Sequence, residues 1–406
     1  MVKGSDAVLA LVVLAVLPFP GCSPRANLDG CDVEAGGIEV IASRGPGAWE
    51  RRGLSAELRE LWRAGGLREG EELAYPVGAV VSPQGRLAIA DFQLSEALVL
   101  EPDGSWLGAW GTPGQGPGEV ATPVAANWDR RDGTLAVFDF ARAHVVFLRD
   151  GESAREDVAL DPAPLAPILA SGAMSWAGVQ PSGGVLLQPA PVVEPVDPGW
   201  FRSVILFLAP GAGGADTLAV NRSPPLGRAP PFASFAAPGW PQLVAAIGTD
   251  GVIALGGMDS RYRVLFLDEH ARPFRVICRD SLPPPLTEHE SRASPEFAGT
   301  GGWRAEMGRA PKPNSLAPFG RLVLGARGRL WVQRERSSPL WRGERLLGVA
   351  GASYDVFGAD GGYLGQIEAP PQARLQAAAG DTVWAYEIGE LDETWVVAYA
   401  LQLSPD

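Results

Sequence analysis

The sequence predicts an all-β protein: a six-bladed β-propeller of four-stranded antiparallel blades, with an N-terminal strand closing the last blade. Three observations lead to this fold class: a strand motif that recurs six times, Asp-Gly turns between short apolar runs, and a last repeat without its fourth strand. The composition agrees, because 51 glycines and 37 prolines without a collagen-like period indicate many tight turns.

The recurring motif is a turn glycine followed by an apolar strand. Successive copies start 48, 50, 68, 77 and 52 residues apart. Three of these spacings lie close to the period of about 40–50 residues that is typical of a four-stranded blade, and the two longer ones contain insertions. The copies begin at Gly85, Gly133, Gly183, Gly251, Gly328 and Gly380.

Each copy is flanked by further apolar strands in a fixed order. In the first copy, residues 77–81 precede the motif, 97–100 follow it, and the turn Asp103-Gly104 leads into a fourth strand at 106–110. Asp-Gly between apolar runs is a strong hairpin signal, because the turn requires positive φ angles. Four antiparallel strands per repeat form a propeller blade. Equivalent strands are expected at 144–148, 243–247, 263–267, 274–277, 354–357 and 363–367.

The last copy has a third strand at 395–401, and the sequence ends five residues later. We expect residues 38–42 to supply its fourth strand and so to remove an exposed sheet edge.

Residues 55–64 have helical spacing and a possible cap at Ser55, so they are predicted to form a helix. The insertion at 283–316 lacks a strand pattern and is expected to lie as a helix or loop over one face.

The N-terminal residues 1–21 are typical of a signal peptide. An apolar run at 7–17 is too short to cross a bilayer as a helix, and Lys3 precedes it. Gly21 and Cys22 resemble the lipobox of bacterial lipoproteins, although Phe19 and Pro20 replace the usual residues there.

The lipobox resemblance implies lipidation at Cys22 and a tether over residues 22–36, and the repeats then assign residues 37–406 to the propeller. The protein would then be exported and anchored by its lipid, with Ser23 implying the outer membrane facing the periplasm. The alternative is a plain secretory signal that is cleaved nearby. Cys31 and Cys278 would remain, either paired in an oxidising compartment or as separate thiols.

A formal net charge of −13 argues against nucleic acid, whose phosphates require a basic surface, and against polybasic membrane binding. The lipid anchor would therefore be the only attachment to a membrane. We expect a monomer whose partner is an unidentified protein or a small molecule.

The whole pattern resembles bacterial exported six-bladed propellers of the NHL and TolB-like type. The repeated glycine-strand-aspartate motif, the segment 110–119 and the segment 259–267 carry this resemblance, which extends over about residues 37–404. It implies the architecture and leaves the function open, because propellers carry many unrelated activities.

Candidate ligand residues are few. Asp91 and Asp139 end equivalent strands, and with Asn127 on a neighbouring strand they could hold Ca²⁺ through oxygen ligands near the axis. The competing interpretation is turn capping by the aspartates. A metal-dependent hydrolase or lyase built on these residues is the alternative function.

No catalytic residue emerges from the sequence. The chain has three histidines, no paired-histidine or CxxC zinc motif and no Gly-x-Ser-x-Gly elbow. No cofactor is predicted beyond possible Ca²⁺. The leading hypothesis is a non-enzymatic envelope protein that binds a ligand or acts as a scaffold through one propeller face.

The segment 334–342 after the fifth motif alternates arginine with other residues. A recognition loop for an acidic or aromatic partner would use Arg334, Arg336, Trp341 and Arg342. A solvated insertion is the alternative.

Overall fold

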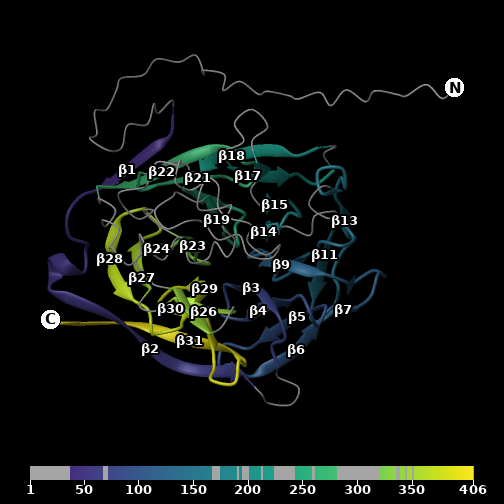
Figure 1. The fold of residues 1–406 in the computed structure, drawn as a ribbon, viewed down its shortest axis with the longest axis horizontal. Coiled ribbons are helices and arrows are strands. Elements are labelled where there is room, and N and C mark those ends of the chain that lie inside the picture. Colours follow the sequence, from purple (N-terminus) through teal and green to yellow (C-terminus); the bar gives the residue numbers. More distant parts are fainter. Residues whose placement is uncertain are drawn as a thin grey trace, which may run out of the picture.

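The structure is a computed structural model, in which six sheets, each built on four antiparallel strands and some with a fifth, are arranged around one axis like the blades of a propeller (Figure 1). The description covers residues 37–66, 72–166, 174–189, 192–193, 201–211, 214–223, 243–257, 261–280, 320–334, 339–342, 345–349 and 352–405. Within these ranges a single short 3₁₀ helix, η1 (Glu50–Arg52), interrupts a fold that is otherwise strands and turns.

Blades one to three follow one another along the chain, each starting at the axis and running outward. Blade one contains β3 (Pro76–Val81), β4 (Leu87–Asp91), β5 (Glu96–Leu100) and β6 (Trp106–Trp110). Blade two contains β9 (Pro123–Trp128), β10 (Leu135–Asp139), β11 (His144–Arg149), β12 (Glu152–Ser153) and β13 (Val158–Ala159). Blade three contains β14 (Met174–Val179), β15 (Val185–Pro189), β16 (Val192–Val193), β17 (Phe201–Leu208) and β18 (Asp216–Ser223).

Blades four to six complete the ring. Blade four contains β19 (Val244–Ile247), β20 (Ile253–Gly256), β21 (Arg263–Leu267) and β22 (Pro273–Arg279). Blade five contains β23 (Arg321–Leu324), β24 (Leu330–Arg334), β27 (Ser353–Phe357) and β28 (Tyr363–Glu368), and β25 (Pro339–Arg342) with β26 (Arg345–Val349) forms a separate hairpin. Blade six contains β29 (Arg374–Ala379), β30 (Thr382–Ile388), β31 (Thr394–Pro405) and β2 (Leu54–Gly65).

The predicted fold class is confirmed, including the repeat and the strand order within it. All six motif glycines adopt positive φ angles, between 57° and 97°, as their turn positions require. Strands predicted at 106–110 and 263–267 coincide with β6 and β21, and the other predicted strands differ by a few residues at their ends.

Two predictions for the N-terminal segment were wrong. Residues 55–64 form the closing strand β2 rather than a helix, and they pair antiparallel with β31 from Leu54 opposite Pro405 to Gly65 opposite Trp395. Residues 38–42 do not close blade six. They belong to β1 (Glu39–Ser43), which pairs in parallel with β22 as a fifth strand of blade four.

The N-terminal segment therefore follows the rim of the propeller across three consecutive blades (Figure 1). After β1 it reaches blade five, where the N–H of Ala48 and of Trp49 donates to the carbonyls of Tyr363 and Leu364. It then enters blade six as β2. The approach to blade five needs glycine, because a Cβ on Gly47 would lie 2.3 Å from the Leu364 carbonyl oxygen.

The core lies between blades, where apolar faces of neighbouring sheets meet. Trp331, Tyr354, Leu375 and Val397 pack between blades five and six, and all four are fully buried. Burying such faces is the main favourable contribution to folding, at about 25 cal/mol per Å² of apolar surface. Each blade is thus stabilised by its two neighbours, so the last blade must also pack against the first.

Blade six meets blade one through the C-terminal half of β2. Ala64 is buried against Leu87, Ile89 and Leu98 of blade one, in the same cluster as Trp384. The indole N–H of Trp62 donates to the carbonyl of Pro102 at 2.9 Å. These contacts join the first and last blades through a strand that precedes both of them in the sequence.

The signal sequence, Cys22 and the tether all lie outside the described residues, and so does the insertion 283–316. Among the described residues no helix is long and apolar enough to span a membrane.

Cys278 in β22 is fully buried and disulfide-bonded. The sequence left the pairing of Cys31 with Cys278 open, and both other cysteines, Cys22 and Cys31, lie outside the described residues. If Cys22 is lipidated, its sulfur is not free to pair, which leaves Cys31 as the partner.

We expect Ala64→Asp to lower the free energy of unfolding by roughly 3 kcal/mol, because it places an unpaired carboxylate in the core between blades six and one. Ala42→Asp is the matched control, since it makes the same change at an exposed position of β1 and should cost less than about 0.5 kcal/mol. Urea denaturation measures both. Equal losses would contradict the assignment of β2 as the closing strand.

Candidate functional site

The innermost strand of every blade starts at the same end of the propeller, which we call the upper face. There the first residue of the strand pairs with a residue at the end of the second strand, as in Pro76 opposite Asp91 and Arg374 opposite Tyr386. The innermost strands contact one another around the axis. Their first residues therefore encircle the upper end of the axis.

The two predicted aspartates lie on this face, and their carboxylates are occupied. Asp91 is fully buried and accepts hydrogen bonds from the backbone N–H of Tyr75, Gln93 and Leu94 at 3.0–3.1 Å. Asp139 is also fully buried and accepts from Ala121 and Thr122 at 2.8 and 3.1 Å. Both therefore cap the chain segments that enter the innermost strands.

Asn127 lies near the axis as expected, but toward the lower end of β9. Asp139 pairs with Pro123 and Asn127 pairs with Ala136, so about four residues, or roughly 13 Å, separate the two levels along the strand. The side-chain amide of Asn127 donates to the carbonyls of Val179 and Gly248 at 3.0 and 3.1 Å. It connects blade two to blades three and four.

The three residues thus do not converge on one point. Among the described residues no group of three His, Cys, Asp or Glu side chains could hold a metal ion. The glycine-rich segment after Trp110 is a connection between blades, in which the N–H of Gly116 donates to the Glu119 carboxylate at 2.7 Å.

Arg334, the first residue of the predicted recognition loop, lies inside the protein between blades four and five. Its Nε lies 3.7 Å from the buried Asp355 carboxylate, which also accepts from Arg279 at 2.6 Å and from the Tyr363 hydroxyl at 3.2 Å. This arginine therefore belongs to a structural polar cluster. Arg336 and the side chains of Trp341 and Arg342 lie outside the described residues.

Two arginines at the upper end of the axis were not anticipated from the sequence. Arg321 is the first residue of β23 and Arg374 the first of β29. Arg321 pairs with Gln333, five residues after its motif glycine, and Arg374 with Tyr386, six residues after its own, so they lie one register step apart in neighbouring blades. The Arg321 guanidinium donates through Nη2 to the Gln376 side-chain oxygen at 2.5 Å, and its Nη1 is buried without a partner. Gln376 is the extra residue of a β-bulge, a feature that often redirects a side chain.

Among the described residues, neither of these guanidiniums has a carboxylate partner. Five other arginines, each with a side chain at most 23% exposed, lie within 4.0 Å of an acidic side chain. These are Arg142, Arg275, Arg279, Arg329 and Arg334. Leaving the half-buried Arg321 guanidinium without an opposite charge costs stability, because its desolvation is not offset. The exposed Arg374 keeps its hydration.

The electrostatics of the pair follow from this arrangement. Burial, together with the neighbouring Arg374 charge, lowers the pKa of Arg321, and burial also lowers the pKa of Arg374. Both remain cations at neutral pH, because a guanidinium starts from a very high pKa. The Arg374 side chain is exposed to solvent, so the pair can be reached from outside.

A phenol completes the set of donors. Burial raises the pKa of Tyr386, so its hydroxyl stays protonated, and this hydroxyl is buried without a hydrogen-bond partner. Tyr386 stands directly opposite Arg374 in the sheet, and opposite residues point to the same side. The upper end of the axis thus combines two cationic groups with an unsatisfied neutral donor.

A sequence signal for the two arginines did exist. Arg321 precedes the apolar run Leu322–Leu324, at the register position that Gly78 and Ala125 occupy in other blades. A charge at a position that is apolar elsewhere in a repeat is unusual. Recognising it requires the correct alignment of the repeats, which the motif glycines supply.

Comparison with known proteins supports the fold. No family model matches the chain, and no curated protein matches its sequence. Among solved structures, a DUF4221 family member from Bacteroides vulgatus is similar, with 10% identity and a TM-score of 0.50 over 87% of this chain and 99% of that one.

Two further solved structures are also similar. A Bacteroides fragilis protein whose name describes a candidate exported protein has 11% identity and a TM-score of 0.44, covering 89% of this chain and 99% of its own. Virginiamycin B lyase from Staphylococcus aureus has 11% identity and a TM-score of 0.38, covering 85% and 99%. Likeness at such low identity shows a shared fold alone, so membership of the NHL or TolB-like type stays a prediction.

We expect Asp139→Asn to lower the free energy of unfolding by about 1–3 kcal/mol, because the new amide N–H₂ would face backbone donors that the carboxylate now accepts. Asp150→Asn is the control: Asp150 is an exposed turn residue at φ 51°, which asparagine tolerates. Chemical denaturation with and without Ca²⁺ measures both. Stabilisation of the unaltered protein by Ca²⁺ that Asp139→Asn abolishes would instead show a metal role.

Proposed function

We propose that this chain is an exported, lipid-anchored binding protein whose propeller holds an anionic ligand at the upper end of its axis. The observation that carries the proposal is the pair Arg321 and Arg374, for which the described residues of this chain of net charge −13 supply no carboxylate partner. A ligand with a carboxylate or phosphate group would supply the missing negative charge. Ionised oxygens accept from guanidinium groups in short, strong hydrogen bonds.

The roles of the individual groups follow from their positions. Arg321 would donate through its free Nη1, while its bond to Gln376 holds the guanidinium in place. Arg374, which solvent reaches, would meet the ligand first. The Tyr386 hydroxyl would donate a neutral hydrogen bond. Binding would offset the repulsion between the two cations, so it should stabilise the fold.

The alternative of a metal-dependent hydrolase or lyase built on Asp91, Asp139 and Asn127 is less well supported. Both carboxylates already accept backbone hydrogen bonds, and Asn127 lies at a different level of the axis. A non-enzymatic binding role needs none of these groups to change partners. Export and lipidation rest on the apolar run and on Gly21-Cys22.

We expect inorganic phosphate or succinate to raise the melting temperature of the purified propeller at constant ionic strength, and Arg321→Gln and Arg374→Gln to weaken this binding at least about tenfold. A hydrogen bond to a charged group contributes about 1.5–3 kcal/mol, and 1.4 kcal/mol corresponds to a factor of ten. Comparing the two anions distinguishes a phosphate from a dicarboxylate preference.

Arg327→Gln is the matched control, because Arg327 is exposed in the turn after β23, at the other end of that strand. It changes the net charge equally and should keep the response. Without anion, Arg374→Gln should be as stable as the unaltered protein or more stable, since it removes like-charge repulsion. An equal response to anion in all variants would refute the proposed site.

We expect bacterial cells that produce the full chain to incorporate a radioactive fatty-acid label into it, and Cys22→Ala to abolish the label because the acylated thiol is lost. Ser23→Ala is the control, because it changes the neighbouring residue and keeps the Cys22 thiol, and it should keep the label. Label retained by Cys22→Ala would refute lipidation at this position and would leave a plain secretory signal.

A further inference from the structure

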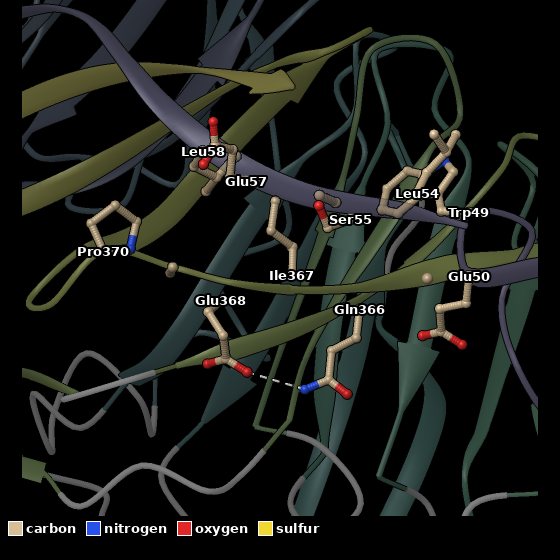
Figure 2. A pocket seen from close by; sticks show the side chains of 13 residues that line it. Trp49, Glu50, Leu54, Ser55, Glu57, Leu58, Gln366, Ile367, Glu368 and Pro370 are labelled. Carbon is tan, nitrogen blue, oxygen red and sulfur yellow. Dashed lines mark hydrogen bonds between the residues drawn. The ribbon is translucent and has the colours of Figure 1, made fainter. Parts of the chain in front are cut away.

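A groove lies at the rim of the propeller between the outermost strands of blades five and six (Figure 2). It has a volume of about 540 Å³ and is open to solvent along one side. One wall is β28 with the residues that follow it, and the other is the first half of β2. It is separate from the upper end of the axis and does not depend on the function proposed there.

One wall of the groove is an unpaired sheet edge. The N–H of Ala369 donates inward to the Ala352 carbonyl, so Ile367 and Gly365 also bond inward in the alternating antiparallel pattern. The backbone N–H and C=O of Gln366 and Glu368 therefore point outward. No described residue pairs with them along this edge.

The same molecule already uses this kind of edge to bind an extended segment. Ala48 and Trp49 donate to the carbonyls of Tyr363 and Leu364 on β28, and β1 pairs with the outer edge of blade four in parallel. The pairing on β28 stops where the chain turns away into η1. A further strand could continue it along the next residues of β28.

The chemistry of the groove differs between its two sides. On the side of β2, the partly buried Leu54, Ala56 and Leu58 face blade five and pack near Ile367. Figure 2 shows Ile367 pointing toward β2, whereas Gln366 and Glu368 point away from it. Glu50 lies on that second side too. The lining residues include three glutamates, Glu50, Glu57 and Glu368, and no lysine or arginine.

A strand added to this edge would present its side chains alternately to the two sides. Residues facing β2 would meet apolar side chains, and residues facing the other way would meet carboxylates. The sheet edge supplies main-chain hydrogen bonds, which is the common mode of recognition by strand addition.

We propose that the groove binds an extended segment of a partner protein in which apolar residues alternate with lysine or arginine. The segment would add to β28 as a fifth strand of blade five, through the outward backbone groups of Gln366 and Glu368. Its basic side chains would pair with Glu368 and Glu50, and its apolar side chains would cover Ile367 and Leu58.

The probe is a fluorescent seven-residue peptide of alternating lysine and valine, titrated with the purified propeller and followed by polarisation. A control peptide of the same composition carries N-methyl groups on alternate amides, which removes main-chain donors. We expect the first peptide to bind and the second to bind at least about tenfold more weakly. Absence of binding at millimolar concentrations of protein and peptide would overturn the proposal.

Variants at Glu368 separate the contribution of its carboxylate to peptide binding from that of its backbone N–H. Glu368→Ala removes the carboxylate, and Glu368→Pro also removes the outward N–H; proline is tolerated where an edge N–H faces solvent. We expect binding to weaken in Glu368→Ala and to fall further in Glu368→Pro. Glu50→Lys reverses a charge in the groove and should weaken peptide binding more than about twofold. Glu152→Lys makes the same change on the exposed strand β12 and should leave binding within about twofold.

Circular dichroism and melting temperature show whether each variant folds. A folded Glu368→Pro that binds as tightly as Glu368→Ala would overturn strand addition. Edge-to-edge dimers of the propeller that Glu368→Pro abolishes would also overturn it, because a second copy would then be the occupant. Anion binding is measured in the same variants. If it is unchanged while peptide binding falls, the result concerns the groove and not the site at the upper face.

Discussion

The pairing of β2 with β31 is the constraint on which the rest of the propeller depends. Each blade buries its faces against two neighbours, so a ring with an open joint would expose the faces of blades six and one. The joint is closed by a strand from the other end of the chain, which couples the N-terminal segment to the fold of the C-terminal blade. Pairing of segments so far apart in the sequence costs loop-closure entropy, which makes this step of folding slow.

The same N-terminal segment determines which edges remain free. It covers the rim of blade four with β1, touches one end of β28 with Ala48 and Trp49, and completes blade six. Because Gly47 brings the chain so close to β28 and η1 then turns it away, the remaining edge of blade five stays open. The proposed peptide groove is thus a consequence of how the ring is closed.

At the upper face, the half-buried Arg321 has no carboxylate partner among the described residues, whereas Arg142, Arg275, Arg279 and Arg329 do. Partly buried charge without a partner lowers stability, and such groups are often retained at functional sites. Asp91 and Asp139 were candidate ligands in the sequence because they end equivalent strands, yet their carboxylates accept hydrogen bonds from backbone N–H groups. Repeat position alone did not distinguish a capping carboxylate from a ligand.

The sequence by itself determined the blade count and the strands within each blade, because turn glycines and Asp-Gly hairpins act locally through φ preferences and period-two burial. It did not determine the fate of residues 55–64, whose apolar residues fit a helix as well as a strand, until the free edge of β31 offered hydrogen bonds along their whole length. Only the tertiary structure brought Arg321 and Arg374 together and left Asn127 at another level, since these are relations between blades. Side chains that meet across the axis belong to blades far apart in the sequence, so local sequence patterns do not predict which of them come together.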